Sequence, residues 1–417
     1  MIAQNYRPRF WDATVRTLTL ALLLIDLGAA TALAQNRAYV GNRGGFSLSV
    51  IDTATNTQVA TIPFQTDLNS IAITPDGALV YVAHGNGTVS AINARNNTVI
   101  TNVPNGLSAI RIAAAPNGAF VYVTNSNTNT VSVISTATNT ITATIPDAGR
   151  LSFDIAISPN GAFGYVTGLL SNTVTIFDTS TNTVTATLPV GTAPAGVAFT
   201  PNGAFAYVAN LLSNNVNVIS TATNTIVATV SVGSEPVTVG ITPNGAFAYV
   251  VNQSSNDVSV IDTATNTVVA TVPVGSLPGE VAIHPNGASV YVTNIFSNTV
   301  SVINTATNTV AATLTGFNQP VPIAIGTITQ EPLPALIAQV QALIDAGTLT
   351  HNEGDALIDK LNQVTAKLAN NQTSGACNQL DAFVNQVHAF INNGSLTAAQ
   401  GQALINAANV VAGSIPC

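Results

Sequence analysis

The sequence predicts an all-β seven-bladed β-propeller, with four antiparallel strands per blade, followed by a small α-helical C-terminal domain of about four helices. A Tyr-Val pair followed by a small or polar residue begins at Tyr39, Tyr81, Tyr122, Tyr165, Tyr207, Tyr249 and Tyr291. The steps between these tyrosines are 42, 41, 43, 42, 42 and 42 residues. A fixed period of about 40 to 45 residues made of short strands is typical of propeller blades. From Pro334 onwards the apolar pattern changes to a helical period.

The first 34 residues have the pattern of an export signal. Three arginines precede an apolar run over residues 18–34, and Ala-Leu-Ala at 32–34 fits a cleavage site before Gln35. Asp26 interrupts the run and disfavours a stable membrane span, because a charge at mid-bilayer is costly. We expect cleavage and an exported protein that is periplasmic, extracellular or on the cell surface. An uncleaved anchor is the alternative.

Each repeat of the predicted propeller, residues 35–329, encodes four strands in the same order. In the repeat from residue 237, the first strand ends in Thr-Pro-Asn-Gly at 242–245. Proline presets φ in that turn and Asn-Gly accepts left-handed geometry. Tyr249 lies in the second strand, residues 258–261 form the third, and residues 268–273 form the fourth. The same turn signal recurs at Pro75-Asp76-Gly77, Pro116-Asn117-Gly118, Pro159-Asn160-Gly161, Pro201-Asn202-Gly203 and Pro285-Asn286-Gly287.

The phase of the repeat predicts how the ring closes. The propeller begins with a second strand, which contains Tyr39, and it ends with a first strand over residues 321–325. We expect these N-terminal and C-terminal strands to share one blade. Closure of this kind removes the open sheet edges that invite aggregation.

Two tetrapeptides carry a resemblance to a known family. Tyr122-Val123-Thr124-Asn125 and Tyr291-Val292-Thr293-Asn294 both read YVTN, and a Val-Ile-Asp-Thr run at 260–263 accompanies them. On these motifs, residues 36–328 resemble the YVTN-family β-propeller repeat proteins. That resemblance implies the propeller fold. It implies no single function, because the family includes surface-layer proteins, extracellular binding proteins and relatives of lactonases.

Residues 330–417 predict helices. Leu336, Val340 and Ile344 share one helical face, and Gly347 then stops the helix. Thr350-x-x-Glu353 is a capping box that opens a second helix.

The helical pattern recurs after an offset of 47 residues, with Gly394 and a Thr397-x-x-Gln400 box, so we expect two related helical hairpins. Both cysteines, Cys377 and Cys417, lie in this module. An exported pair of cysteines predicts one disulfide, which would stabilise by roughly 3–4 kcal/mol. On the duplicated Gly-x-Leu-Thr corner and the cysteine pair, the module resembles the FIMAH domain, which implies an accessory for adhesion or attachment.

Composition and motifs exclude several function classes. Only 7% of residues are charged, no lysine precedes Lys360, and the net charge is −8. This composition disfavours nucleic-acid binding and a basic membrane-surface patch. No stretch after residue 34 is long and apolar enough to span a bilayer. The sequence contains no nucleophile elbow, P-loop, zincin motif or dinucleotide fingerprint, so we predict no catalytic residue, no metal site and no cofactor.

The four histidines show no metal-like spacing. His84 replaces the Asn of a Tyr-Val-x-Asn unit, and His284 precedes the proline of a hairpin where other blades have Thr or Ser. We expect both to be loop substitutions rather than catalytic bases.

One position in the first strands varies around the ring and favours a binding site. It reads Ser70, Arg111, Asp154, Gly196, Thr238, Glu280 and Pro322. Its polar members would line the mouth of the central channel, where propeller ligands usually bind. This mouth would open on the loop face, which we define as the face with the loops between second and third strands and between successive blades. The candidates are Arg111, Asp154, Glu280, Thr238 and Ser70.

The charged candidates also allow two simpler arrangements. Arg111 and Asp154 lie in adjacent blades and could pair only with each other. A Ca²⁺ ion between Asp154 and Glu280 would have few carboxylate ligands.

The loops between second and third strands carry apolar residues where other blades have Ser, Asn or Gln. They are Leu169, Leu170, Leu211, Leu212, Ile295, Phe296 and Phe46. Apolar loop tips predict a contact surface. Packing against the neighbouring blade is the alternative.

We therefore expect an exported, non-enzymatic binding or surface-structural protein that uses the loop face for a protein or glycan partner at the cell surface. The alternative is a lactonase-like hydrolase with a site at the channel mouth.

Overall fold

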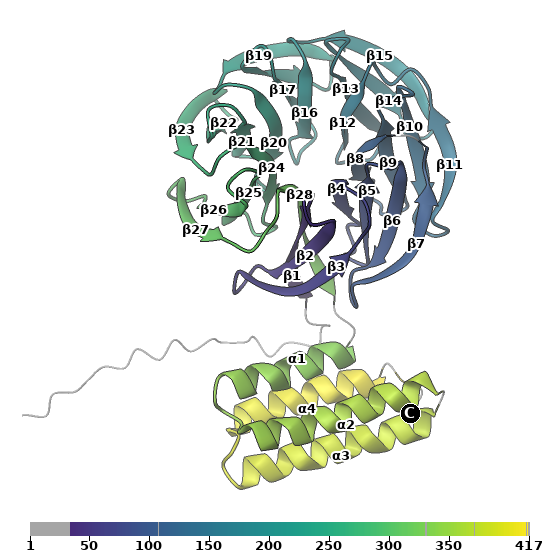
Figure 1. Cartoon of the computed structure of the whole chain (residues 1–417), viewed down its shortest axis with the longest axis vertical. Coiled ribbons are helices and arrows are strands. Elements are labelled where there is room, and N and C mark those ends of the chain that lie inside the picture. The colour runs from purple at the N-terminus through teal and green to yellow at the C-terminus, as the bar shows by residue number, and fades with distance from the viewer. Residues whose placement is uncertain (1–33, 107, 330–331, 371, 414, 416–417) are drawn as a thin grey trace, which may run out of the picture. The chain divides into compact units, whose positions relative to one another are not determined.

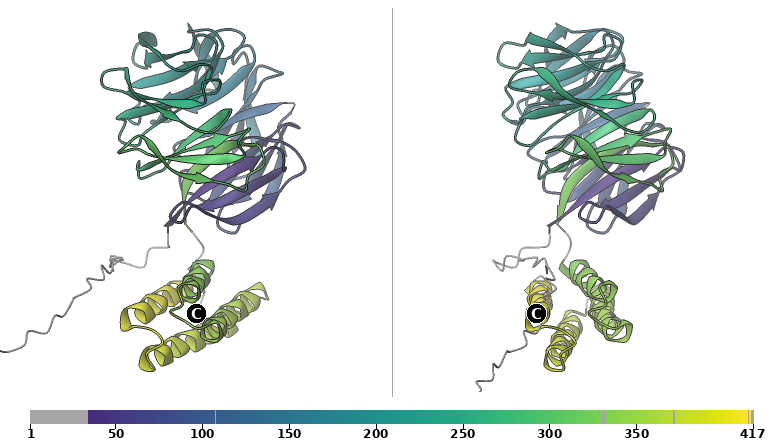
Figure 2. Two further views of the ribbon diagram at one scale, coloured as in Figure 1. Left: turned by 60° about the vertical axis from the view of Figure 1, so that its left-hand side comes forward. Right: turned by 90° about the vertical axis from the view of Figure 1, so that its left-hand side faces the viewer.

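The computed structural model describes residues 34–106, 108–329, 332–370, 372–413 and 415. Seven four-stranded antiparallel sheets surround a central axis (Figure 1), which confirms the predicted fold class. The sheets are twisted, as the side views in Figure 2 show. The export signal predicted for residues 1–34 lies, except for Ala34, outside the described residues.

Strands occupy equivalent places in every blade. The first strands, nearest the axis in Figure 1, are β4 (Leu68–Ile73), β8 (Ala109–Ala114), β12 (Ser152–Ile157), β16 (Pro194–Phe199), β20 (Pro236–Ile241), β24 (Pro278–Ile283) and β28 (Pro320–Thr329). The second strands are β1 (Ala34–Asn42), β5 (Leu79–His84), β9 (Phe120–Asn125), β13 (Phe163–Gly168), β17 (Phe205–Asn210), β21 (Phe247–Asn252) and β25 (Ser289–Asn294). The third strands are β2 (Ser47–Asp52), β6 (Thr88–Asn93), β10 (Thr130–Ser135), β14 (Thr173–Asp178), β18 (Asn215–Ser220), β22 (Asp257–Asp262) and β26 (Thr299–Asn304). The fourth strands, at the rim, are β3 (Thr57–Pro63), β7 (Thr98–Pro104), β11 (Thr140–Ile145), β15 (Thr183–Pro189), β19 (Thr225–Ser231), β23 (Thr267–Pro273) and β27 (Thr309–Leu314).

Burial explains the composition of each strand type. The second and third strands are buried along their centres, as in β21 and β22, because neighbouring blades cover both faces of each sheet. These strands therefore read as nearly continuous Val, Ile, Ala and Tyr. Fourth strands such as β23 are mostly exposed and rich in Thr and Val.

In five of the seven blades, the hydroxyl of the recurring tyrosine donates a hydrogen bond to an asparagine of the next blade. The hydroxyl of Tyr249 in the sixth blade donates to Asn308 Oδ1 in the seventh over 2.7 Å. Tyr291 makes the same bond to Asn56 across the closure of the ring, at 2.6 Å. Each acceptor asparagine has a positive φ, which asparagine tolerates in a tight turn. The period seen in the sequence is thus the period of an interblade hydrogen bond.

The last strand of the ring completes the blade that contains the first. β28 pairs antiparallel with β1, from Ala34 opposite Thr329 to Asn42 opposite Pro320. The strand is longer than the five residues expected, because the pairing runs on past Ile325 towards the chain ends. Since the two strands belong to opposite ends of the propeller sequence, this blade has no turn between its first and second strands.

The C-terminal part contains four helices, α1 (Pro332–Asp345), α2 (His351–Ala369), α3 (Thr373–Asn392) and α4 (Ala398–Gly413), as predicted. They share one apolar core that includes Leu336, Leu361 and Phe383. Both predicted capping boxes form, at Thr350 with Glu353 and at Thr397 with Gln400. Among the described helices, none is both long and apolar enough to cross a membrane.

The two helical hairpins are related in three dimensions as in sequence. A Cβ added at Gly354 would lie 2.1 Å from Ile344, and one added at Gly401 would lie 2.3 Å from Ile391. The second glycine and the second isoleucine each lie 47 positions after the first. Each hairpin therefore uses one glycine for the same close helix–helix approach. Cys377 packs against the shared core. The disulfide stays a prediction, because Cys417 lies outside the described residues.

Candidate functional site

The site at the channel mouth is built from irregular first strands. Each of the seven first strands has a register shift against its second strand at or beside the variable position identified in the sequence. A bulge re-aims a side chain and is frequent next to binding sites. All seven first strands therefore share the same local irregularity at this position.

Arg111, Asp154 and Glu280 meet at the axis. Arg111 Nη1 donates to Glu280 Oε2 over 2.6 Å, which joins β8 in the third blade to β24 in the seventh. Arg111 Nε lies 4.0 Å from Asp154 Oδ1. The closest ion pair of Arg111 is thus with a carboxylate from a distant blade, and Asp154 in the adjacent blade is the weaker neighbour.

Further contacts fix these three side chains. Arg111 Nη1 also donates to the carbonyl of Asn69 over 3.1 Å, and the Phe153 ring centre lies 5.3 Å from the guanidinium carbon. Asp154 Oδ2 accepts the backbone N–H of Val197 over 2.9 Å. The sequence did not predict Phe153 or Asn69 at this site, because neither residue type by itself indicates a contact with an arginine.

Burial changes how readily the two carboxyls ionise. Loss of solvent raises the pKa of Glu280 to about 7, although Arg111 opposes the shift. Burial also raises the pKa of Asp154, against the opposing effect of Arg111. Two carboxyls therefore share one arginine, and near neutral pH Glu280 exists in both protonation states. A carboxyl of this kind has the pKa required of a general acid or base.

Ser70 and Thr238 do not join the charged cluster. Both are buried, at 6% and 5% exposure. Ser70 Oγ accepts the N–H of Ile112 in the next blade. Thr238 lies against Gly196, where an added Cβ would be 2.6 Å from Thr238 Cα. These two residues belong to the walls between first strands.

The apolar loop tips divide into a packed and an exposed residue. Leu169, Leu211 and Ile295 are half-buried, and Leu211 packs against a core cluster that includes Val237 of the next blade. The following residues, Leu170, Leu212 and Phe296, are 60%, 61% and 69% exposed, and Phe46 is 44% exposed. Each Leu-Leu or Ile-Phe pair therefore has one half-buried and one exposed side chain, and Leu211 shows the expected packing against the neighbouring blade.

Backbone hydrogen bonds hold the exposed tips in place. The amides of Leu170, Leu212 and Phe296 donate to carbonyls of the interblade loops, at 3.2 Å in each case. Asn172 ends the loop that carries Leu170, and its side-chain Oδ1 accepts the backbone N–H of Ala193 in the next interblade loop. The apolar side chains are thus presented by an ordered network of loops.

His84 has a structural role. It is 2% exposed, and its ring nitrogens bond Ser90 Oγ and Thr66 Oγ1 at 2.7 and 3.2 Å. In the first blade, Asn42 bonds Ser49 in the same way. Burial lowers the pKa of His84 to about 4, so it is neutral at physiological pH.

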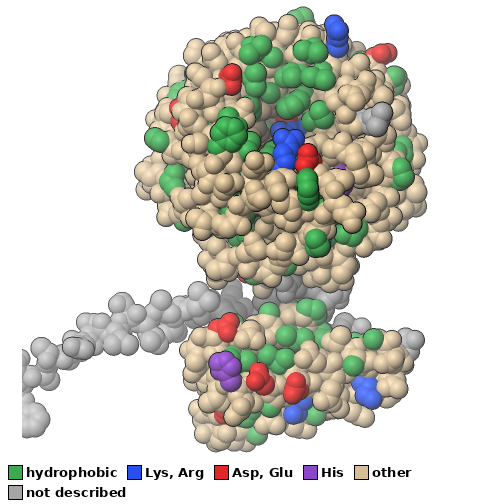
Figure 3. Space-filling view, viewed as in Figure 1, with side chains coloured by type: hydrophobic (Ala, Val, Ile, Leu, Met, Phe, Trp, Pro, Cys, Tyr) green, Lys and Arg blue, Asp and Glu red, His purple; other side chains and the backbone are tan. Residues whose placement is uncertain are grey.

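Figure 3 looks down the ring axis and shows a hollow at its centre. Basic and acidic side chains lie next to each other in this hollow, and hydrophobic side chains surround it. Within the described part of the chain, no group of three or more His, Cys, Asp or Glu side chains is arranged to hold a metal ion.

Comparisons with known proteins agree with both parts of the structure. Residues 155–327 match the family model described as Lactonase, 7-bladed beta-propeller, and residues 333–413 match that of the FIMAH domain. No curated protein matches the chain significantly.

Two solved structures illustrate the similarity in fold. Kuenenia stuttgartiensis hydrazine synthase is 22% identical with a TM-score of 0.60, over 64% of this chain and 92% of that one. A functionally unknown protein from Desulfotomaculum acetoxidans DSM 771 is 21% identical with a TM-score of 0.61, over 71% of this chain and 100% of that one. At such identities the likeness concerns the fold alone.

Proposed function

We propose that this chain, a seven-bladed β-propeller repeat protein with a C-terminal FIMAH domain, is a non-enzymatic binding protein that holds a protein partner on the loop face. The observation that carries the proposal is the exposure of Leu170, Leu212 and Phe296 on loops that backbone hydrogen bonds keep in place. Large apolar side chains held in water by an ordered backbone are typical of contact surfaces. Their fixed positions also lower the entropy lost on binding.

The chemistry of the tips favours a protein over a glycan. These apolar side chains gain free energy by burial against another apolar surface and offer no hydrogen bonds to sugar hydroxyls. Burying each exposed tip contributes roughly 1–2 kcal/mol, whereas association costs at least ~4 kcal/mol. The polar residues around the tips must therefore also contact the partner.

A pull-down from cell-surface extract tests this function. The variant Leu170→Ser, Leu212→Ser, Phe296→Ser should lose a partner that the unmodified chain retains. The matched control is Val59→Ser, Val227→Ser, Val269→Ser, which removes exposed side chains (48%, 53% and 52%) from fourth strands instead. Because the control sites lie at the rim, this second variant should retain the partner.

The outcome separates the possible partners. Protease treatment of the extract should abolish capture, and glycosidase treatment should leave it intact. The reverse pattern would identify a glycan and contradict a protein partner. Equal capture by all three forms of the chain would remove the loop tips from the interface.

A second candidate function is a lactonase-like hydrolase. It is supported by the family-model match over residues 155–327 and by the cluster of Arg111, Asp154 and Glu280. In this case Glu280 would act as acid or base and Arg111 would stabilise negative charge on the lactone oxygen. Lactone hydrolysis that Glu280→Gln and Asp154→Asn abolish, while the loop-tip variant retains it, would favour the enzyme.

We further propose export to the cell surface, with the FIMAH domain as the attachment module. The support is the signal-like composition of the first 34 residues together with the match over residues 333–413. N-terminal sequencing of the exported protein should begin at Gln35. A chain that retains residue 1 would favour the uncleaved anchor instead.

A further inference from the structure

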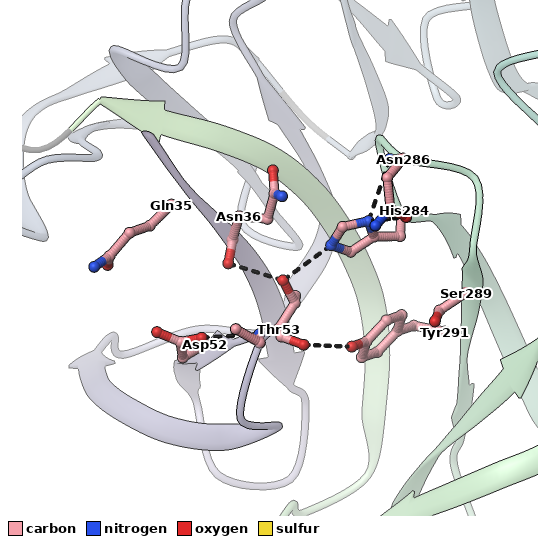
Figure 4. Close-up of a pocket in the computed structure, with 9 residues that line it drawn as sticks. Gln35, Asn36, Asp52, Thr53, His284, Asn286, Ser289 and Tyr291 are labelled. Atoms are coloured by element: carbon pink, nitrogen blue, oxygen red, sulfur yellow. Dashed lines mark hydrogen bonds between the residues drawn. The ribbon is translucent and has the colours of Figure 1, made fainter. Parts of the chain in front are cut away.

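A polar cavity lies at the seam where the ring closes, between the seventh blade and the first (Figure 4). Its volume is about 370 Å³, within the usual range for small-molecule sites. Asp52 and Thr53 of the first blade line one side, and His284, Asn286 and Ser289 of the seventh line the other. This cavity is separate from the charged cluster at the channel mouth, with which it shares no lining residue.

The method of ring closure helps to create the cavity. At other seams the turns between first and second strands stack on each other. A Cβ added at Gly287 would contact Pro243 of the preceding blade, and one added at Gly245 would contact Pro201. The first blade has no such turn to cover the turn at His284, because its two inner strands come from opposite ends of the propeller.

A substitution in the seventh blade enlarges this space. Ser289 begins β25, where the corresponding second strands begin with Leu79, Phe120, Phe163, Phe205 and Phe247. The hydroxymethyl group leaves room that a large apolar side chain occupies elsewhere. The position therefore breaks the repeat at the same seam where the turn is missing.

Both ring nitrogens of His284 have partners within the protein. Asn286 Oδ1 accepts the backbone N–H of Ala288 over 2.9 Å, so this atom is an oxygen. His284 Nδ1 lies 2.6 Å from the same oxygen and 3.3 Å from the backbone nitrogen of Asn286. His284 Nε2 lies 3.1 Å from the hydroxyl of Thr53, which itself donates to the carbonyl of Asn36 over 3.0 Å. In the sixth blade, Thr242 bonds Asn244 in the place of this histidine.

The charges at the seam balance. Asp52 Oδ2 lies 3.5 Å from Arg37 Nη1, which is a buried donor without a hydrogen-bond partner among the described residues. The pair leaves no excess charge to hold an anion or an ammonium group. Asp52 lines the cavity, and its carboxylate has lone pairs that can accept a hydrogen bond from a hydroxyl group.

The backbone around Thr53 argues against acyl transfer in spite of the His284 contact. The N–H of Thr53 donates to Asn36, and that of Ala54 donates to Asp52. Neither amide remains to stabilise an oxyanion beside the Thr53 hydroxyl. The arrangement is suited to binding.

A regular seam provides a comparison. A depression of about 300 Å³ lies between the fifth and sixth blades, and its lining contains Phe205 and no ionisable side chain. A depression between neighbouring blades thus occurs at more than one seam. The side chains of Asp52 and His284 in its lining, and the Ser at the phenylalanine position, distinguish the closure seam.

We propose that the cavity at the closure seam binds a neutral, hydroxyl-rich molecule of monosaccharide size, with Asp52 as a hydrogen-bond acceptor and His284 as part of the cavity wall. This site is independent of the protein partner proposed for the loop face.

Calorimetric titration of the full chain with glucose, glucuronate and glucosamine tests the proposal. Glucose should bind best of the three. Ser289→Phe restores the residue of other blades and should weaken glucose binding by at least ~10-fold without lowering the melting temperature. His284→Thr, which also restores the repeat, should weaken it too, whereas Ser289→Ala should retain it.

Each other result overturns the assignment. Absence of heat with all three sugars at millimolar concentration removes the site, as does unchanged glucose binding in Ser289→Phe. Tighter binding of glucuronate or glucosamine would contradict the charge balance inferred for Asp52 and Arg37. Loss of partner capture by Ser289→Phe would mean that the two faces are not independent.

Discussion

At the residue scale, the titration of Glu280 makes the free energy of unfolding depend on pH. Its pKa is raised by burial from 4.5 to about 7, so the folded protein holds this proton more tightly than the unfolded chain. The associated stability is complete below pH 4.5 and is lost as the pH rises through about 7, a loss of up to ~3 kcal/mol. Glu280→Gln is neutral throughout and should flatten the fall in unfolding free energy between pH 5 and pH 7.

Urea denaturation at several pH values measures this dependence. Glu235→Gln is the matched control, because Glu235 lies in an interblade loop and bonds Ser254 rather than an arginine. The control should keep the pH dependence of the unmodified chain. A Glu280→Gln variant with an equally steep profile would show that Glu280 is not the titrating group.

At the element scale, the tyrosine hydrogen bonds join successive sheets. Tyr249→Phe removes the donor to Asn308 and should lower the free energy of unfolding by ~1 kcal/mol. Tyr122→Phe provides the comparison, since the corresponding acceptor, Asn182 Oδ1, has no partner in the described structure. Chemical denaturation should show a smaller loss for Tyr122→Phe. Equal losses would mean that the tyrosine hydroxyls do not join the blades.

The first strands also depend on close backbone approach. A Cβ at Gly196 would lie 3.0 Å from the carbonyl of Val237 in the neighbouring strand, as well as against Thr238. Gly196→Ala should therefore cost about 1–3 kcal/mol, measured by thermal unfolding. Gly85→Ala meets only an ordinary contact, 3.5 Å from Asp67 Cβ, and should leave the melting temperature nearly unchanged.

At the scale of the whole molecule, the ring depends on its last strand. A chain that ends at residue 330 keeps β28 and should fold as a propeller, because the pairing of β28 with β1 ends at Thr329. A chain that ends at residue 319 leaves β1 and its neighbouring blades with open edges and should aggregate. Circular dichroism and size-exclusion chromatography distinguish the two. A stable, monomeric shorter chain would contradict closure by β28.

Much of the fold could be predicted because each repeat contains local sequence signals for its turns and strands. Each Pro-Asn-Gly turn and each apolar strand shows its structure within a few residues, and the phase of the repeat identifies the closing strand. The same position in every first strand also selected Arg111, Asp154 and Glu280. The sequence could not predict that Arg111 lies closer to Glu280 than to Asp154, because this depends on how the side chains extend across the ring axis.

The sequence alone determined the seven blades, their closure and the paired helical hairpins, since these follow from periodicity and from which strand comes first. The tertiary structure decided which loop residues pack and which protrude, and which polar groups meet. It also revealed the seam cavity, where Asp52 and His284 come together from repeats more than 200 positions apart. No local pattern records such a meeting, because it arises only when the ends of the ring are joined.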